Sequence, residues 1–198
     1  MQSMNHRYFI IYKPFNMVSQ FIGNDGLRQL HEIDYEFPEG IHAIGRLDSH
    51  SEGLLLLTTN KKITKLLFEN KIPHRRTYIV QVLNVITEEK VEQLRKGISI
   101  KIKGNIEWVT SPCEVDIIEK PSNLYPVDNS LKEFIPHSWL RITLTEGKYH
   151  QIRKMVFAMR HRCRRLIRVS IEDMHLNDLA PGMVKEVHEA DFFRLLKI

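Results

Sequence analysis

Hydrophobic and polar positions along the chain follow two periods, one typical of strands and one typical of helices. Short apolar and β-branched runs predict strands at residues 7–12, 42–48, 53–58, 77–83, 113–118, 138–145 and 165–170. Apolar positions at helical spacing predict helices at residues 60–70, 87–97, 148–159 and 191–196. Asn60 and Thr87 stand at the start of their helices and are predicted to cap them, because both side chains accept backbone N–H bonds.

The order of these segments predicts the fold class. Strands outnumber helices and do not alternate with them regularly, which favours α+β with a mainly antiparallel or mixed sheet and flanking helices. Prolines mark residues 120–136 as a long surface loop, and no composition shift around it indicates a domain linker. The chain of 198 residues is therefore predicted to form one domain spanning residues 1–198.

Composition narrows the class of protein further. Apolar residues make up 42% and charged residues 27% of the chain, as in ordinary globular proteins. The sequence contains no secretory pattern at its start and no apolar run long enough to span a bilayer. Cys113 and Cys163 form no Cys-x-x-Cys pair, which indicates a reducing compartment rather than a disulfide scaffold. We expect a cytoplasmic protein that has no membrane contact.

Positive charge is concentrated rather than spread along the chain, whose formal net charge is +5. One cluster has Glu146 as its only acid and contains Arg141, Lys148, Arg153, Lys154, Arg160, Arg162, Arg164, Arg165 and Arg168. A second cluster contains Lys61, Lys62, Lys65, Lys71, Arg75 and Arg76. A single basic run is usually a solvated surface, but two clusters from distant parts of the sequence favour a surface that binds nucleic-acid phosphates.

The sequence lacks the common motifs of cofactor and metal enzymes. No dinucleotide-binding glycine pattern, phosphate-binding loop or nucleophile elbow occurs, and no histidine spacing indicates a metal site. We therefore expect neither a cofactor nor a metal.

One carboxylate stands out, because Asp48 ends the segment Gly45-Arg-Leu-Asp at the end of a predicted strand. A lone Asp in a loop is usually a turn or cap residue. Asp48 and Glu52 are alternatively a carboxylate pair for acid–base chemistry on a glycosidic bond. Arg46 would lie on the same side of an extended chain as Asp48. These residues alone do not decide between the two interpretations.

Residues 45–58, from Gly45-Arg-Leu-Asp to Leu-Leu-Leu-Leu-Thr58, resemble a signature of the bacterial pseudouridine synthases that modify single uridines in ribosomal RNA. Further segments resemble the family's other motifs in the expected order. These segments are Tyr12-Lys-Pro14, Arg76-Thr-Tyr-Ile-Val80 and Glu146-Gly-Lys-Tyr-His-Gln-Ile-Arg-Lys-Met155, followed by Leu166-Ile-Arg168. The matches cover nearly the whole chain, so chance is a poor explanation of them.

The resemblance implies an isomerase with the pseudouridine synthase-like catalytic fold, built as two subdomains around a central RNA-binding cleft. The chain is most similar to the short E-type members that act on the large ribosomal subunit, because its first catalytic strand begins near residue 7 and leaves no room for the small S4 domain. We therefore expect a monomer that acts on 23S rather than 16S ribosomal RNA. Some positions depart from the family pattern: Lys61 and Lys62 replace Asp-Gly, Arg76 replaces Lys, Lys185 replaces Arg, and a glycine after Arg168 is missing.

The resemblance also implies roles for single residues. Asp48 is the catalytic carboxylate, which attacks ribose C1′ or removes the C2′ proton, and Arg153 is the counter-ion that keeps it charged. Tyr78 stacks on the uracil and places its hydroxyl near the departing C5 proton, and Leu166 packs against the base. Arg46 fills the space that the flipped uridine leaves. Glu52 is expected to be structural.

The other basic residues are expected to bind the RNA backbone. They are Lys61, Lys62, Arg76, Lys148, Lys154, Arg160, Arg162, Arg164, Arg165 and Arg168. The alternatives to a pseudouridine synthase are an RNA-binding ribosome-assembly protein without catalytic activity, and a glycosidase-like hydrolase that uses Asp48 and Glu52.

Overall fold

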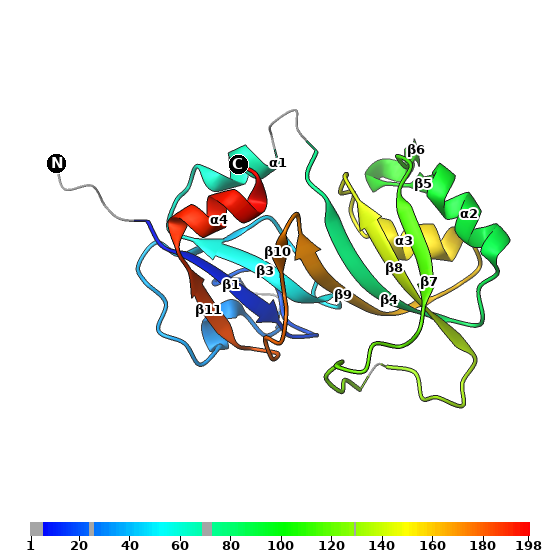
Figure 1. Ribbon diagram of the computed structural model, residues 1–198, viewed down its shortest axis with the longest axis horizontal. Coiled ribbons are helices and arrows are strands. Elements are labelled where there is room, and N and C mark those ends of the chain that lie inside the picture. Colours follow the sequence, from blue (N-terminus) through cyan, green and yellow to red (C-terminus); the bar gives the residue numbers. More distant parts are fainter. Residues whose placement is uncertain (1–5, 24–25, 69–72, 129) are drawn as a thin grey trace. The chain divides into compact units, whose positions relative to one another are not determined.

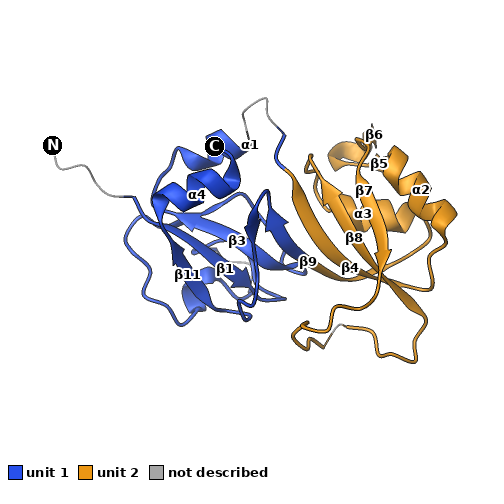
Figure 2. Cartoon of the chain, viewed as in Figure 1, with its two compact units in different colours: residues 1–74, 168–198 blue, residues 75–167 orange. Residues whose placement is uncertain are grey.

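The computed structural model describes residues 6–23, 26–68, 73–128 and 130–198 (Figure 1). The chain forms two compact units (Figure 2). Unit 1 comprises residues 1–74 and 168–198, and unit 2 comprises residues 75–167. Unit 2 is thus inserted in the sequence of unit 1, which both ends of the chain build.

Unit 1 contains strands from both ends of the chain. Its elements are β1 (Tyr8–Lys13), β2 (His42–Ile44), β3 (Glu52–Thr58), α1 (Ile63–Phe68), β10 (Met174–His175), β11 (Val184–Val187) and α4 (Glu189–Leu196), with a 3-10 turn at Leu30–Glu32. β1 pairs antiparallel with β3 on one side and with β11 on the other, and β2 pairs antiparallel with β3. All residues of β1 and β3 are buried, because apolar side chains cover both faces of these strands.

The two faces of β1 carry different parts of the unit 1 core. Phe9 and Ile11 pack with Leu55 and Leu57 of β3 in one buried cluster. On β1, Tyr8 contacts Phe192 of α4, with ring centroids 4.7 Å apart. A strand with apolar residues on both sides is typical of a sheet covered on both faces, so the aromatic and β-branched run of β1 explains its central position.

Unit 2 is built around the antiparallel strands β4, β8 and β7. Its elements are β4 (Arg76–Leu83), α2 (Glu88–Lys96), β5 (Ser99–Lys101), a 3-10 turn at Lys103–Asn105, β6 (Glu107–Val109), β7 (Glu114–Ile118), β8 (His137–Leu144) and α3 (Gln151–Ala158). β8 lies between β4 and β7, and β5 pairs with β6 in a separate hairpin. β9 (Cys163–Ile171) begins in unit 2 and ends in unit 1.

Helices α2 and α3 bury their apolar faces in the core of unit 2. Val91 and Leu94 of α2 join Met155 and Val156 of α3 in one buried cluster with the strands. α2 ends at Gly97, whose φ of 91° is in the region that favours glycine. A Cβ atom there would lie 2.2 Å from the Thr110 carbonyl oxygen, so close packing as well as the positive φ requires this glycine.

The α+β prediction is confirmed, and so is every helix and strand that the sequence predicts, with shifted ends. The predicted strand at 42–48 ends at Ile44, because Gly45 turns the chain with a φ of 70°. The helix predicted for residues 60–70 begins at Ile63 and reaches Phe68, and residues 69 and 70 lie outside the described residues. The short strands β5, β6, β10 and β11 are not among the predicted elements.

The predicted helix caps differ in how they act. The Asn60 side chain accepts the backbone N–H of Lys62 at 3.1 Å, just before α1. Thr87 stands at the N-terminal cap position of α2 but makes no side-chain capping bond, and only its carbonyl oxygen accepts bonds from the first turn. Within the described part of the chain, no helix has the length and apolar character needed to cross a membrane.

Candidate active site

Asp48 lies in unit 1, in the loop between β2 and β3, and its side chain is half-buried. The loop is fixed next to Asp48 on both sides. The backbone N–H of Leu47 donates to Ser19 Oγ at 2.9 Å, and Ser19 Oγ donates to the Leu47 carbonyl oxygen at 2.7 Å. The Asp48 carbonyl oxygen accepts the N–H of buried Ser51 at 2.9 Å. The fold therefore presents Asp48 on a loop held by hydrogen bonds.

A buried lysine supports the same loop from the interior of unit 1. Lys13, at the end of β1, is completely buried, and its ammonium donates to the carbonyl oxygens of Pro14 and Met17 at 2.8 and 2.6 Å. A longer contact of 3.5 Å reaches the carbonyl oxygen of Ser49, next to Asp48. One cationic group thus contacts the backbone of two separate loops.

The charges around Lys13 oppose one another. The pKa of Lys13 is lowered from 10.5 to about 7, and burial is the largest cause. The negative charges of Glu52 and Asp48 raise this pKa, and the positive charge of Arg168 lowers it. Glu52 is itself buried and accepts the hydroxyl of Tyr12 at 2.7 Å. The expectation that Glu52 is structural agrees with its place in this buried network, which contains the candidate catalytic Asp48 at its edge.

Arg168 is part of the interior of unit 1 and not of its surface. Only 3% of the residue is exposed, and its Nε donates to the Leu54 carbonyl oxygen at 2.8 Å. Its Nη2 atom is buried and has no hydrogen-bond partner among the described residues. The basic cluster in the sequence predicts Arg168 on an RNA-binding surface, but the side chain is buried and bonds to the backbone of β3 instead.

Tyr78 and Leu166 lie in unit 2 and are close to its core. Tyr78 is on β4 opposite Ile142 of β8, and it is half-buried against the core cluster. Leu166 on β9 is a member of that cluster, with 5% of the residue exposed. Packing in the core accounts for Leu166, and its contact with a base stays a prediction.

The segment before α3 is organised by the carboxylate of Glu146. Its oxygens accept the backbone N–H of Ser111 at 2.8 Å, the indole N–H of Trp108 at 3.2 Å and the side-chain amide of Gln151 at 2.8 Å. Buried Gln151 also accepts the backbone N–H of Lys148 at 2.8 Å. These bonds close residues 146–151 into a compact turn that leads directly into α3.

Arg153 and Lys154 lie on α3, where Ile152, Met155 and Val156 supply the buried face. Both basic residues are half-buried. Burial raises the pKa of the nearby Cys163 thiol to about 11, and the positive charge of Arg153 acts in the opposite direction. The helix therefore holds a cationic group at the margin of the unit 2 core.

Arg76 binds the backbone of the segment before α3, a contact that the sequence does not indicate. Its Nη2 atom donates to the Thr145 carbonyl oxygen at 2.9 Å, and its guanidinium lies against Gly147, where a Cβ atom would come within 3.1 Å. Arg76 thus ties β4 to the Glu146 turn. Its expected contact with RNA phosphate stays a prediction.

The remaining basic residues divide into exposed and buried ones. The exposed residues are Arg46, Lys61 and Lys62 in unit 1 and Arg160, Arg162 and Arg164 in unit 2. Arg165 is only 2% exposed, and its guanidinium donates to the Tyr125 carbonyl oxygen at 2.7 Å. It therefore stabilises the long loop of residues 120–136 rather than extending the exposed arginine group. Lys71 lies outside the described residues.

The structure groups the predicted residues by unit. Asp48, Arg46, Lys61, Lys62 and Arg168 belong to unit 1, and the other predicted site residues belong to unit 2. Sequence reasoning missed the buried role of Lys13 and the organising role of Glu146. Both residues stand in segments that resemble family motifs, but a motif position indicates neither burial nor hydrogen-bond partners.

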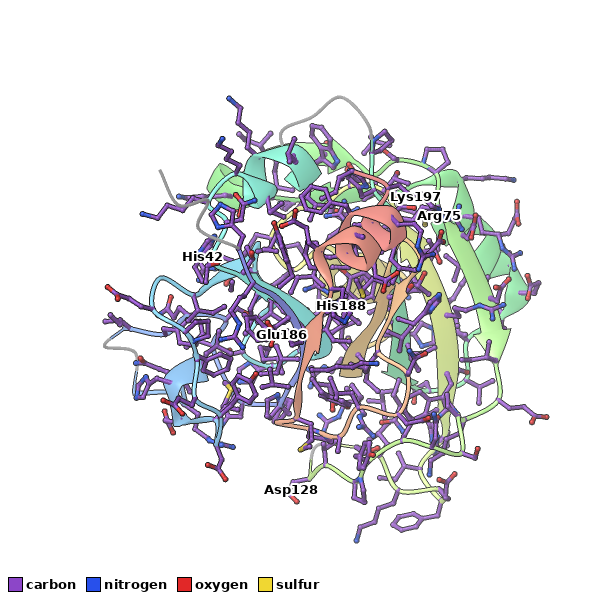
Figure 3. All side chains as sticks on the ribbon, turned by 60° about the vertical axis from the view of Figure 1, so that its left-hand side comes forward. His42, Arg75, Asp128, Glu186, His188 and Lys197 are labelled. Atoms are coloured by element: carbon purple, nitrogen blue, oxygen red, sulfur yellow. The ribbon has the colours of Figure 1, made fainter. Side chains whose placement is uncertain are left out.

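A separate hollow of unit 1 has a volume of about 420 Å³ and is lined by residues of both chain ends. Figure 3 labels Glu186 and His188, which belong to the part of its lining where β11 leads into α4. Glu186 is held by Arg7, whose Nε lies 2.7 Å from the carboxylate. The lining includes none of the residues that the sequence assigns to the reaction.

Comparisons with known proteins point to one family. A family model described as RNA pseudouridylate synthase matches residues 7–158. The chain is similar to a ribosomal large subunit pseudouridine synthase E of Vibrio parahaemolyticus, with 36% identity over 92% of this chain and 74% of the relative. A protein of the same description from Xanthomonas axonopodis is 31% identical over 87% of this chain and 89% of its own length.

A solved structure shows the same fold at lower sequence identity. The crystal structure of a pseudouridylate synthase superposes with a TM-score of 0.78 and 23% identity, covering 96% of this chain and 74% of that one.

The buried ammonium of Lys13 predicts a pH dependence of stability. In the folded protein Lys13 loses its proton at a pKa of about 7, whereas the unfolded chain keeps it to about pH 10.5. The unfolded state therefore binds more protons within this window, and the Lys13 contribution to the free energy of unfolding rises with pH by at most about 1.4 kcal/mol per pH unit. Below pH 7 both states are protonated, and this contribution is constant.

Urea unfolding followed by circular dichroism from about pH 6.5 to 9.5 measures this effect. The stability of the wild-type protein is expected to rise relative to Lys13→Met as the pH increases. Lys65→Met, which changes an exposed lysine of α1, is the control and is expected to give a difference that does not depend on pH. A constant difference for Lys13→Met as well would contradict the lowered pKa.

Proposed function

We propose, because the chain belongs to the RNA pseudouridylate synthase family, that it converts one specific uridine of 23S ribosomal RNA to pseudouridine. The chain is an isomerase of this family, and the choice of 23S RNA is supported by the large-subunit descriptions of its relatives. The observation that carries the proposal is Asp48, half-buried on a loop that hydrogen bonds hold, at the position of the family's carboxylate.

The chemistry requires one carboxylate and no oxidant. The bond between uracil N1 and ribose C1′ breaks, the base turns, C5 bonds to C1′, the C5 proton leaves and N1 gains a proton. Asp48 acts either by attacking C1′ or by removing the C2′ proton, and both routes require its ionised form. Lys13 contacts the carbonyl oxygen of Ser49 next to Asp48, so it helps to hold the loop in place for either route.

Tyr78 and Arg153 complete the proposed chemistry. Tyr78 is half-buried, and this position suits a ring that stacks on uracil and a hydroxyl that assists removal of the C5 proton. Arg153 contributes a cation that stabilises the carboxylate form of Asp48. Arg46 is exposed, so its guanidinium suits the space that the flipped uridine leaves in the RNA.

The first test removes the charge of Asp48 and keeps its shape. Asp48→Asn is expected to fold and bind ribosomal RNA normally and to lose at least about a thousandfold in the rate of pseudouridine formation. Purified protein and protein-free 23S and 16S RNA are incubated, and pseudouridines are mapped by nucleotide. The wild-type protein is expected to give one new pseudouridine in 23S RNA.

Glu52→Gln is the matched control, since it changes the neighbouring carboxylate of the same segment. It is expected to lower stability, because Glu52 is buried against the Tyr12 hydroxyl, while activity of the folded protein persists. Equal loss of activity in both folded variants would favour the two-carboxylate hydrolase. RNA binding without any pseudouridine in the wild-type product would favour a ribosome-assembly protein.

The Tyr78 hydroxyl is tested by Tyr78→Phe, which keeps the ring. RNA affinity is expected to stay within about twofold of wild type, and single-turnover rates are expected to fall about a hundredfold or more, because general acid–base assistance is lost. Tyr125→Phe changes an exposed tyrosine of the 120–136 loop and is the control. Wild-type rates for Tyr78→Phe would limit Tyr78 to stacking or packing.

The exposed arginines after α3 are proposed to hold the RNA backbone with Lys61, Lys62, Lys148 and Lys154. Replacing Arg160 and Arg162 with Gln is expected to weaken binding to RNAs of any sequence and to reduce the salt dependence of affinity by about one unit of slope per lost phosphate contact. The control variant replaces Lys96 and Lys101, which are exposed elsewhere on unit 2, and removes the same charge.

Binding titrations at several salt concentrations separate these outcomes. An equal change of slope in both double variants would show that total charge rather than these arginines sets the affinity. Arg165 and Arg168 are left out of this test, because both are buried and their replacement would disturb the fold.

A further inference from the structure

A pair of stacked aromatic rings, of which Tyr149 is exposed and His150 half-buried, lies directly before α3, in the turn that Glu146 organises. Tyr149 is 66% exposed although it is a large ring in a segment fixed by hydrogen bonds. Its ring stacks on that of His150, with centroids 3.9 Å apart and planes 18° from parallel. His150 adopts a left-handed backbone conformation with a φ of 56°, which is uncommon for a residue with a side chain.

One lysine contacts this pair, and a second lysine of the same turn contacts another aromatic ring. The ammonium of Lys154 lies 5.3 Å from the centroid of the Tyr149 ring. The ammonium of Lys148 lies 3.8 Å from the ring centroid of Trp108, which Glu146 holds through its indole N–H. The aromatic ring of Phe157, further along α3, is also 68% exposed. Aromatic rings interleaved with cations form the kind of surface that binds single-stranded nucleic acid.

The turn is stiff where it carries Tyr149. Gln151 bonds the backbone of Lys148 and the side chain of Glu146, and the N–H of Lys154 donates to the His150 carbonyl oxygen at 3.0 Å. A fixed ring loses little conformational freedom when a flat partner stacks on it, so less of the stacking energy is lost to ordering the ring. The high exposure of Tyr149 shows that packing in the core does not explain an aromatic ring at this position.

We infer that the Tyr149–His150 pair is a stacking site for one unpaired nucleobase of the RNA substrate. Lys148 and Lys154 bind the phosphates on either side of that base. Tyr149 precedes Arg153 by four residues, and both belong to unit 2. This site rests on the proposed function and adds a preference for a target uridine in a single-stranded loop.

The test compares affinities for three probes: a short single-stranded RNA, the duplex of the same sequence, and the same single strand with abasic sites. Tyr149→Ala is expected to bind the single strand at least about fivefold more weakly than wild type, because stacking of a base is lost. Its affinity for the duplex and for the abasic strand is expected to be unchanged. Tyr149→Phe keeps the ring and is expected to bind all probes as wild type does.

Phe134→Ala is the matched control, because Phe134 is also an exposed ring of unit 2, 79% exposed and 6.0 Å from the ammonium of Lys132. It is expected to leave all affinities unchanged. Lys148→Gln with Lys154→Gln is expected to weaken binding of all probes, since the phosphates are common to them. Equal thermal unfolding of Tyr149→Ala and wild type confirms that the turn is intact.

The inference is overturned if Tyr149→Ala binds the single strand as tightly as wild type, or if it loses affinity equally for all probes. Pseudouridine formation by the wild-type protein tests the proposed function separately. An active wild type combined with an unaffected Tyr149→Ala rejects the stacking site alone. An inactive wild type with weakened single-strand binding of Tyr149→Ala rejects the proposed reaction and leaves a single-stranded RNA surface.

Discussion

The backbone next to Asp48 is contacted from the interior by the nitrogen of one buried lysine. Lys13 contacts backbone carbonyl oxygens of two loops from the end of β1, and Glu52 and Arg168 set opposite charges beside it. A buried cation is costly unless hydrogen bonds and charges compensate it, and here the compensation comes from the backbone that must be held in place. The hydrogen bonds that offset the cost of burying Lys13 therefore include the bond to the backbone beside Asp48.

In unit 2, a carboxylate holds the backbone next to residues assigned to the chemistry. Glu146 accepts three N–H groups from Trp108, Ser111 and Gln151, and so fixes the turn that begins α3. Arg76 approaches the same turn from β4 and binds the Thr145 carbonyl oxygen. In each unit, one charged side chain binds the backbone next to residues that are assigned to the chemistry. A charged residue in these motifs can therefore have a structural role instead of a catalytic one.

The sequence predicts the elements with long periodic patterns and misses the short ones. β1 and β3 are evident because their apolar runs are buried on both faces, whereas β5 and β6 are only three residues long and carry polar residues. The candidate site comes from motif resemblance, which supplies residue identities without their surroundings. Burial of Arg165 and Arg168 is not predictable, because a guanidinium in a basic run gives no sign that a backbone carbonyl will bind it.

The insertion of unit 2 into unit 1 has a consequence for synthesis of the chain. β1 can pair with β3 early, but its other edge pairs with β11, which leaves the ribosome only after the whole of unit 2. At about 5–20 residues per second, β1 waits roughly ten to thirty seconds for that partner, while the continuous unit 2 emerges in full. The order of emergence therefore favours completion of the inserted unit first, and the unit that carries Asp48 is completed last.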